Sequence, residues 1–468
     1  MILKIQNPFR LSVRSVAAVF FLALCLISVS CNDDDSTPAP AQNIVEVAQG
    51  NSDLTSLVSA LTKFPDLVAT LSGPGTFTVF APSNQAFSNL LTAVGQTSLN
   101  DVPEDVLKKI LQYHVVGAAV KSTELTAGDV NTVANEKIAV TLNPLKLNGS
   151  VNVTTADVLT TNGVVHIVDA VLVNPSILPI VGTIVAPAYF NKNFTTLIAA
   201  VNGASPSILE TLLSSPKKTL FAPTNAAFIA AGITTLPNQA TLDAVLTYHV
   251  LNSEVRAANL PANTAPVNSE ITTLGGKFYL SNRGAAGVFI NGRTKVTQTD
   301  IIGSNGVVHV IDRTLMPPSQ TIAQIATALS TATSPQFTKL LQALSRTEAA
   351  TLLAVAGDAT ANITLFAPTD AAFEASGINL ETVNGTTLVS VLQKHIINKP
   401  TTASGRVFSS DLVTGNVATL NGDVAINATA LTVTSGGVVA NIQATTPGLI
   451  NVLGTNGVIH TIDKVLLP

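Results

Sequence analysis

A histidine and an aspartate recur three residues apart at three places in the chain. The pairs are His166 and Asp169, His309 and Asp312, and His460 and Asp463. Imidazole and carboxylate groups bind metals and transfer protons, so each pair could serve a metal ion or a general acid–base reaction. The surrounding residues, however, are typical of a β-strand, in which residues three apart point to opposite faces. We therefore expect His166, His309 and His460 to be buried, hydrogen-bonded structural residues, with a metal ligand or a functional surface as alternatives.

The remaining histidines are His114, His249 and His395, and none of them has a cysteine or a carboxylate cluster nearby. The chain has no Gly-x-Ser-x-Gly motif of the kind that carries a serine nucleophile. The glycine-rich stretch 435–437 lacks the lysine of a phosphate-binding loop. We therefore predict no metal, no cofactor and no catalytic activity, so the protein is not expected to be an enzyme.

Three copies of one unit must position these histidines. The segment FAPSNQAF at 80–87 returns as FAPTNAAF at 221–228 and as FAPTDAAF at 366–373. A second segment, NGVVHIVD at 162–169, returns in close variants at 305–312 and 456–463. Between the two segments lie Tyr113-His114, Tyr248-His249 and Lys394-His395. Self-similarity on this scale indicates tandem copies of one domain.

Each copy is expected to contain two amphipathic helices, because apolar residues recur at positions i, i+3, i+4 and i+7. The first helices carry Leu54, Leu57, Val58 and Leu61; Phe194, Leu197, Ile198 and Val201; and Phe337, Leu340, Leu341 and Leu344. The second helices carry Leu107, Ile110 and Leu111; Leu242, Val245 and Leu246; and Leu388, Val391 and Leu392. His114, His249 and His395 continue the apolar stripe of the second helix, so we expect them to face the core.

The first repeated segment is interpreted as a structural corner between a strand and a helix. Its residues are Pro82, Ser83 and Asn84; Pro223, Thr224 and Asn225; and Pro368, Thr369 and Asp370. The proline ends the strand, and the serine or threonine caps the helix that follows. We expect the asparagine or aspartate to bond local backbone donors, with a polar recognition residue as the alternative.

The second half of each copy is rich in threonine, valine, asparagine and glycine, and stretches such as 137–142 and 151–155 alternate in polarity. This pattern predicts antiparallel strands joined by tight turns. The Asn-Gly pairs at 162–163, 305–306 and 456–457 predict type I′ hairpin turns, whose two central residues have positive φ. Because helices come first and strands later, each unit is predicted to be α+β.

The first thirty residues predict a secretory signal peptide, since Lys4, Arg10 and Arg14 precede an apolar run at 16–29. Cys31 follows a small residue and resembles the lipobox cysteine of bacterial lipoproteins, so we expect it to be lipidated and to attach the chain to a membrane. Residues 33–35 are acidic, similar to the tract that sends some Gram-negative lipoproteins to the outer face of the outer membrane. A plain signal peptide and a solvated charge run are the alternatives.

The composition excludes nucleic acid as a partner, because only 11% of the residues are charged, the formal charge is −4 and no basic run is present. Apolar cores must stabilise the fold, and a hydrophobic content of 46% can supply them. We predict a signal peptide at 1–30, a lipidated tether at 31–42, and domains 1, 2 and 3 at 43–175, 176–317 and 318–468. The proline-containing connections at 174–179 and 317–321 are expected to restrict rotation between neighbours.

The two repeated segments and the Tyr-His pair, in this order and at this spacing, resemble the two homology boxes and the Tyr-His motif of the fasciclin domain family. The resemblance covers nearly all of residues 43–468. It implies three tandem fasciclin-like domains, each a β-wedge of mainly antiparallel strands with packed helices. It also implies a role in cell adhesion or matrix attachment, through binding of proteins and sometimes glycans.

In animal matrix members of this family, adhesion is attributed to the Tyr-His motif and to an Asp-Ile pair before the second box. The resemblance therefore implies a candidate adhesion surface formed by Tyr113, His114, Asp157, Val158, Tyr248, His249, Asp300 and Ile301. The third copy departs from the pattern, because Lys394 replaces the tyrosine and residues 447–449 contain no aspartate. Domain 3 is thus expected to use such a surface least.

The sequence as a whole favours a surface lipoprotein that presents three modules to a protein or matrix partner, anchored in the outer membrane and facing the cell exterior. A polysaccharide-binding accessory lipoprotein is the second hypothesis. It ranks lower because exposed aromatic platforms usually bind sugars, and this chain has no Trp and only four Tyr. A structural envelope spacer is the third. The ligand, the binding face and the oligomeric state do not follow from the sequence.

Overall fold

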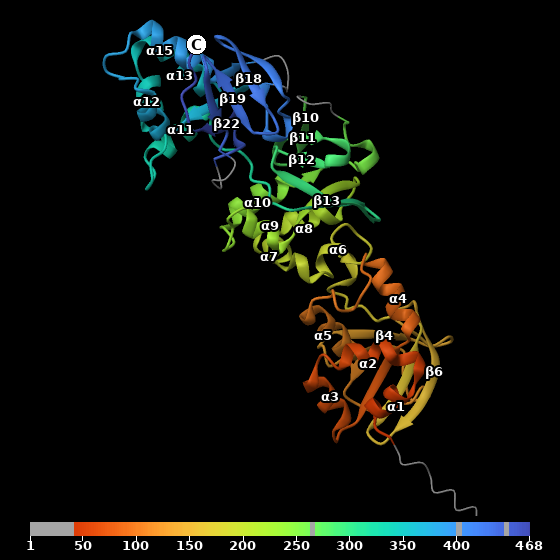
Figure 1. The fold of residues 1–468 in the computed structure, drawn as a ribbon. Coiled ribbons are helices and arrows are strands. Elements are labelled where there is room, and N and C mark those ends of the chain that lie inside the picture. The colour runs from red at the N-terminus through yellow and green to blue at the C-terminus, as the bar shows by residue number, and fades with distance from the viewer. Residues whose placement is uncertain (1–41, 263–266, 399–404, 444–448) are drawn as a thin grey trace, which may run out of the picture. The chain divides into compact units, whose positions relative to one another are not determined.

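The structure, a computed structural model, describes residues 42–262, 267–398, 405–443 and 449–468. The predicted signal peptide, Cys31 and all of the tether except Gln42 lie outside the described residues, as do Pro447 and Gly448. Figure 1 shows the three domains, with many of their helices and strands labelled.

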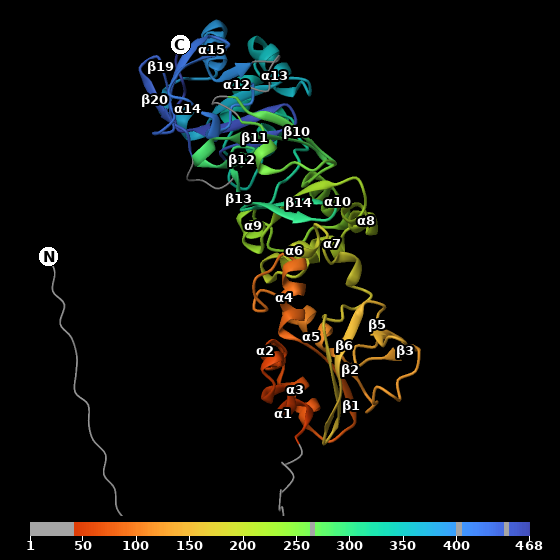
Figure 2. The same cartoon turned by 90° about the vertical axis from the view of Figure 1, so that its right-hand side faces the viewer.

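Domain 1 opens with helices and closes with strands. Its helices are α1 (Ile44–Gly50), α2 (Thr55–Leu61), α3 (Pro65–Ser72), α4 (Asn84–Ala93) and α5 (Glu104–Tyr113). Its strands are β1 (Phe77–Pro82), β2 (Val115–Val116), β3 (Gly128–Asn131), β4 (Lys137–Thr141), β5 (Lys146–Leu147), β6 (Val151–Thr160) and β7 (Gly163–Val168). Helices α1, α2 and α3 lie together on one side of the sheet (Figure 2).

Domain 2 repeats this order. Its helices are α6 (Ala186–Tyr189), α7 (Thr195–Gly203), α8 (Pro206–Leu213), α9 (Asn225–Ala230) and α10 (Gln239–Tyr248). Its strands are β8 (Lys218–Pro223), β9 (Val250–Leu251), β10 (Ser269–Thr273), β11 (Gly276–Asn282), β12 (Val288–Ile290), β13 (Thr294–Gly303) and β14 (Gly306–Ile311).

Domain 3 has the same plan. Its helices are α11 (Ile322–Ser330), α12 (Thr338–Leu344), α13 (Ala350–Gly357), α14 (Asp370–Ser376) and α15 (Gly385–Lys394). Its strands are β15 (Ile363–Pro368), β16 (Ile396–Asn398), β17 (Gly415–Thr419), β18 (Gly422–Asn427), β19 (Thr432–Ser435), β20 (Val438–Asn441), β21 (Val452–Gly454) and β22 (Gly457–Ile462).

The sheets are mainly antiparallel, which confirms the predicted α+β class. Domain 1 has the strand order β2-β1-β7-β6-β5-β4-β3, and domain 2 has the corresponding order β10-β11-β12-β13-β14-β8-β9. In domain 3 eight strands form two four-stranded sheets, with the orders β16-β15-β22-β21 and β17-β18-β19-β20. One parallel pair lies at the centre of each domain, where the strand of the first repeated segment pairs with the strand of the second. The alternating sequence pattern did not predict this parallel pairing.

The parallel pair brings the two repeated segments together. Phe80 is in register with His166, Phe221 with His309, and Phe366 with His460. Their rings lie against each other, with centroids 5.6, 5.4 and 5.9 Å apart. All six side chains are fully buried. The residues that the sequence repeats most faithfully therefore form the centre of the domain.

The corner after each first strand has the predicted form. Ser83, Thr224 and Thr369 are N-caps whose hydroxyl groups accept hydrogen bonds from the backbone N–H groups three residues later. The aromatic residues Phe87, Phe228 and Phe373 then pack into the core, where each is at least 97% buried.

The predicted type I′ turns are wrong by one residue. Thr160 pairs with Gly163, so the two-residue loop is 161–162, and Gly163 is already the first residue of β7. The side chain of Asn162 instead accepts the N–H of Ile44 at 3.0 Å and donates to the carbonyl of Leu71 at 2.8 Å. Asn305 and Asn456 make equivalent bonds in the other domains. The asparagine thus ties the hairpin to two helices.

Candidate functional site

The histidine of each Tyr-His motif is buried at the end of α5, α10 or α15. His114 contacts the carbonyl of Ile110 through Nδ1 at 2.8 Å, and its Nε2 accepts the N–H of Leu172 at 2.8 Å. His249 and His395 make the same pair of bonds. Because Nε2 accepts from an N–H group, the proton sits on Nδ1 and the ring is neutral. Neither nitrogen is available to act as a base.

Burial also lowers the pKa of these rings. The pKa of His114 falls to about 4 because the ring is removed from water, and the pKa values of His249 and His395 fall to about 4 for the same reason. A neutral imidazole whose two nitrogens are both hydrogen-bonded holds α5, α10 or α15 to the segment that follows the last strand. The geometry is that of a structural histidine.

The tyrosines of the motif are buried as well. The hydroxyl of Tyr113 donates to the carbonyl of Lys137 at 2.6 Å, and the hydroxyl of Tyr248 donates to the carbonyl of Lys277 at 2.8 Å. In domain 3 the ammonium group of Lys394 donates to the carbonyl of Asp423 at 2.9 Å. The lysine therefore replaces the tyrosine hydroxyl with another donor, which explains why the third copy tolerates the change.

These positions require a correction to the predicted adhesion surface. The side chains of Tyr113, His114, Tyr248 and His249 are at least 99% buried, so they are not part of a surface in this structure. The other half of the set, Asp157, Val158, Asp300 and Ile301, lies on the long strands β6 and β13. A direct contact with a partner is possible only for this second half.

Asp157 and Asp300 occupy irregular positions in β6 and β13. Each has a positive φ, +61° and +59°, at a point where the register with the neighbouring strand shifts. Such a β-bulge re-aims the residues around it. The backbone N–H of Asp157 points at Nδ1 of His166, 3.2 Å away, and Asp300 relates to His309 in the same way at 3.3 Å.

The carboxylate of each bulge aspartate binds the chain backbone. Asp157 accepts the N–H of Ser122 at 2.7 Å, and its pKa is lowered mainly by the hydrogen bond from the Ser122 side chain. Asp300 accepts the N–H of Ala257 at 2.9 Å. In domain 3 the residue that corresponds to Asp157 and Asp300 is Asn451, which the sequence analysis did not identify. Asn451 has φ +56°, and its side chain accepts the N–H of Ser409 at 2.8 Å. Asparagine tolerates positive φ and accepts a hydrogen bond, as aspartate does.

His166 and Asp169 do not converge on a common site. His166 uses Nε2 to reach the carbonyl of Val120 at 3.0 Å, whereas the carboxylate of Asp169 accepts the N–H of Asn152 at 2.8 Å. Throughout the described part of the chain, no three His, Cys, Asp or Glu side chains gather in a way that could hold a metal ion.

The corner residues Asn84, Asn225 and Asp370 bind donors from the preceding helices rather than from their own. Asn84 accepts the N–H of Ser56 at 2.8 Å and donates to the carbonyl of Ser52 at 2.9 Å. Asn225 repeats both bonds in domain 2. Asp370 accepts the N–H of Lys339 at 2.8 Å but has no amide with which to donate. These side chains therefore join two helices of one domain.

One exposed feature is repeated at the bulges. Leu159 and Ile302 follow the bulge two residues after the aspartate, pair with Val164 and Val307, and are 61% and 52% exposed. Val158 and Ile301, the neighbours proposed from the sequence, are half-buried against the core. The sequence did not distinguish the exposed residue from its buried neighbour, because the bulge breaks the alternation of the strand.

A comparison with known protein families identifies the repeated unit. The model of the fasciclin domain matches residues 52–174, 192–317 and 335–468. The chain belongs to the fasciclin domain family. Its fasciclin domains thus account for the three copies and for the motifs that they share.

Similar fasciclin proteins come from animals and bacteria. The chain is 34% identical over 271 residues to the transforming growth factor-beta-induced protein ig-h3 of Oryctolagus cuniculus, covering 55% of this chain and 37% of that protein. It is 40% identical over 136 residues to the protein sll1483 of Synechocystis, covering 29% of this chain and 75% of that protein. It is 27% identical over 336 residues to human periostin, covering 70% of this chain and 37% of periostin. The chain therefore spans little more than a third of the two animal relatives.

A solved FAS1 domain pair from the insect cell adhesion molecule Fasciclin I is also similar. It is 18% identical, covers 59% of this chain and 97% of its own, and has a TM-score of 0.28. Among the described residues, no single helix is long and apolar enough to cross a membrane. One bent helix pair, Lys192–Gly203 and Pro206–Leu213, meets the criterion by length and composition alone.

Proposed function

We propose that the protein is a cell-surface adhesin that presents three fasciclin domains to a protein or matrix partner, and that it works by binding rather than by catalysis. Family membership supports a general role in adhesion or binding. The observation that carries the proposal furthest is the exposed apolar residue at the bulge in domains 1 and 2, Leu159 and Ile302.

The bulged strands have the properties of a contact surface. Around Leu159 the strand exposes Thr154, Thr155 and Ala156, and around Ile302 it exposes residues 297–300. A large exposed apolar side chain on a strand whose other exposed residues are mostly polar resembles the centre and rim of a protein interface. Two copies on one chain also allow weak contacts to reinforce each other.

The test compares Leu159→Asp, Ile302→Asp and the double variant with the control Ile229→Asp. Ile229 is 68% exposed on α9, so the control changes an apolar residue that is at least as exposed as Leu159 and Ile302 but lies away from the bulges. Beads coated with each protein are incubated with cells and with matrix proteins. We expect the double variant to lose at least ten-fold in retention while the control stays near wild type. Equal retention by all four proteins contradicts the proposed surface.

We also propose that Cys31 carries the lipid and that the chain is anchored in the outer membrane facing outward. The lipobox resemblance supports the attachment, and the acidic residues 33–35 support the location. Metabolic labelling with an alkyne fatty acid, with Cys31→Ser as the control, tests the attachment. Protease treatment of intact cells tests the location, because a chain on the periplasmic side would be protected.

The polysaccharide-binding hypothesis remains the second candidate. A glycan array run beside the cell and matrix assays separates the two functions. Saturable glycan binding that exceeds protein binding would replace adhesion to proteins as the proposed function, and no binding in either assay would favour the structural spacer.

A further inference from the structure

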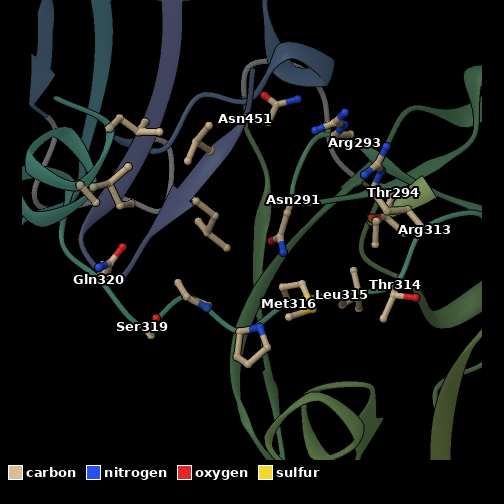
Figure 3. A pocket seen from close by; sticks show the side chains of 18 residues that line it. Asn291, Arg293, Thr294, Arg313, Thr314, Leu315, Met316, Ser319, Gln320 and Asn451 are labelled. Carbon is tan, nitrogen blue, oxygen red and sulfur yellow. The ribbon is translucent and has the colours of Figure 1, made fainter. Parts of the chain in front are cut away.

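A cleft of about 410 Å³ lies where domain 2 meets domain 3 (Figure 3). Its domain 2 wall is formed by the turn between β12 and β13 and by the segment that follows β14. Its opposite wall comes from α11 and from the start of β21. Clefts of this size are large enough to enclose most of a small ligand.

Two arginines line the domain 2 wall of the cleft. The backbone N–H of Asp312 donates to the carbonyl of Lys295, and the N–H of Lys295 donates to the carboxylate of Asp312. This pairing places Arg293 and Arg313 next to one another (Figure 3). The pKa of Arg313 is lowered mainly by burial and secondly by the charge of Arg293. Within the described residues neither guanidinium group forms an ion pair. The charge of Asp312 acts on Arg313 in the opposite direction, but its carboxylate is not within ion-pair distance. Two positive charges therefore face one cleft without a directly paired carboxylate among the described residues.

A buried hydroxyl group in the same wall also lacks a partner. Thr314 lines the cleft and is 97% buried. No described residue forms a hydrogen bond with its Oγ1. Most buried polar side chains are hydrogen-bonded, so such a group needs a partner that enters the cleft. An oxygen atom of a bound anion beside Arg313 would supply one.

The arginines are not needed to build the fold. Two pairs of equivalent residues align domain 1 with domain 2. Asn148 bonds the backbone of β4 as Asn291 bonds the backbone of β11, and His166 corresponds to His309. Counting from these matched residues, domain 1 has Ser150 in place of Arg293 and Ala170 in place of Arg313. Thr314 corresponds to Val171 by the same count. Domain 1 folds with none of these polar groups, which points to a purpose other than stability.

The walls of the cleft are fixed by bonds between the two domains. Asn451 donates from Nδ2 to the carbonyl of Gly292 at 3.0 Å, next to Arg293. Gly292 itself lies against Phe408, because a Cβ at that position would be 2.2 Å from the Phe408 Cβ. The backbone next to Arg293 is therefore held in place before any ligand binds, which reduces the ordering cost of binding.

We propose that this cleft binds an acidic peptide segment of a partner protein, with a carboxylate placed between Arg293 and Arg313. Guanidinium groups bind carboxylates in a bidentate manner. The exposed side chains of Ser319 and Gln320 add a hydroxyl and an amide that can bond a peptide backbone, and Met316, 46% exposed, adds an adaptable apolar contact.

A peptide fits the lining better than a sugar does. None of the described residues that line the cleft is aromatic, so its lining does not offer the stacking surface that sugars usually need. The cleft is a different surface from the bulge residues Leu159 and Ile302. Either site can therefore fail its test without affecting the other, and the outcome here is separable from that of the adhesion proposal.

The experiment measures binding of a blocked hexaglutamate peptide to the detergent-solubilised full chain by calorimetry at low salt. The variants Arg293→Ser and Arg313→Ala introduce the residues of domain 1, and Thr314→Val introduces its valine. We expect each arginine variant to raise the Kd at least ten-fold and Thr314→Val to raise it several-fold. The control Lys464→Ala removes the exposed lysine of domain 3 that corresponds to Arg313, and it should leave the Kd within two-fold.

Three further ligands decide between outcomes. Hexaglutamine should not bind, because it lacks the carboxylates. Inorganic phosphate should bind more weakly than the acidic peptide, since it reaches only the arginines and Thr314. Oligogalacturonate that binds more tightly than the peptide, with the same loss in both arginine variants, would overturn the peptide assignment. Wild-type affinity in Arg293→Ser and Arg313→Ala, with unchanged thermal unfolding, would overturn the site itself.

Discussion

Arg283 of domain 2 and Asp411 of domain 3 form an ion pair in which Nη2 and Oδ1 are 2.6 Å apart. The side chain of Asp411 is fully buried, and that of Arg283 is 11% exposed. Asp411 also accepts a hydrogen bond from Nδ2 of Asn268 at 2.7 Å and one from the hydroxyl of Ser281. Three residues of domain 2 thus converge on one carboxylate of domain 3, and this junction depends on a satisfied buried charge.

We predict that Asp411→Ala destabilises the junction by about 3–5 kcal/mol, because it leaves the Arg283 charge buried without its partner. Urea unfolding of the full chain, followed by proteolysis of the segment between domains 2 and 3, measures the effect. Asp423→Asn is the matched control, since Asp423 is an exposed residue of the same domain. If Asp411→Ala matches Asp423→Asn both in its urea unfolding and in its resistance to protease, the ion pair does not hold the domains together.

A second prediction concerns acid. His395 and His460 of domain 3 have pKa values lowered by burial to about 4, and so have His114 and His249. The ordinary histidine pKa is about 6.5, so between pH 6.5 and 4 the unfolded chain binds more protons than the folded one. The stabilisation is therefore complete above pH 6.5 and is lost as the pH falls toward 4.

Each of these histidines contributes a slope of up to about 1.4 kcal/mol per pH unit within that window. Circular dichroism during acid titration, combined with hydrogen exchange for each domain, measures the loss. His460→Gln removes one titrating group, and we expect the slope for domain 3 to fall by roughly one proton. An identical slope in the variant would mean that His460 titrates normally in the folded state.

The sequence predicted the packed parts of each domain because their signals are local. The apolar stripe of α5 places His114 in the core, and the Pro82–Ser83 corner appears where the strand meets the helix. The repeated Asn162-Gly163 pair was misassigned, since its strongest constraints come from Ile44 and Phe77, far away in the sequence. A local turn pattern contains no information about such partners.

The surface was harder to predict than the core. Family resemblance led to Tyr113 and His114, which are buried, whereas Leu159 is exposed only because a bulge at Asp157 changes the strand register. Arg293 and Arg313 lie twenty residues apart in the sequence and meet through strand pairing across β13 and β14. No periodic pattern in the sequence indicates the exposure of Leu159 or the proximity of the two arginines.

A third prediction concerns the glycine that opens the last strand. A Cβ at Gly306 would lie 2.0 Å from the carbonyl oxygen of Lys218, its partner in the parallel pair, and the residue has φ +149°. Gly306→Ala should therefore force β8 and β14 apart and cost several kcal/mol, well above the backbone term alone.

The matched control is Gly232→Ala, whose φ of +82° is also unfavourable for alanine but whose added Cβ would have no atom of a described residue within 4 Å. It should cost only about 1 kcal/mol of backbone strain. Thermal unfolding of both variants provides the comparison. Similar losses in the two proteins would show that strain, and not the close approach of the strands, makes this glycine necessary.

The last prediction tests the corner asparagine as a connection between helices. Asn84 accepts the N–H of Ser56 and donates to the carbonyl of Ser52, whereas its counterpart Asp370 keeps only the accepting half. Asn84→Asp should therefore cost less than about 1 kcal/mol, because domain 3 already folds with that arrangement. Asn84→Ala removes these bonds and a third one, from the hydroxyl of Thr55, and it leaves the N–H of Ser56 without its acceptor. This should cost about 1–3 kcal/mol. Urea unfolding ranks the two variants. If alanine is tolerated as well as aspartate, the side chain does not stabilise the start of α2, and a role in recognition becomes the better explanation for the asparagine at this half-buried corner.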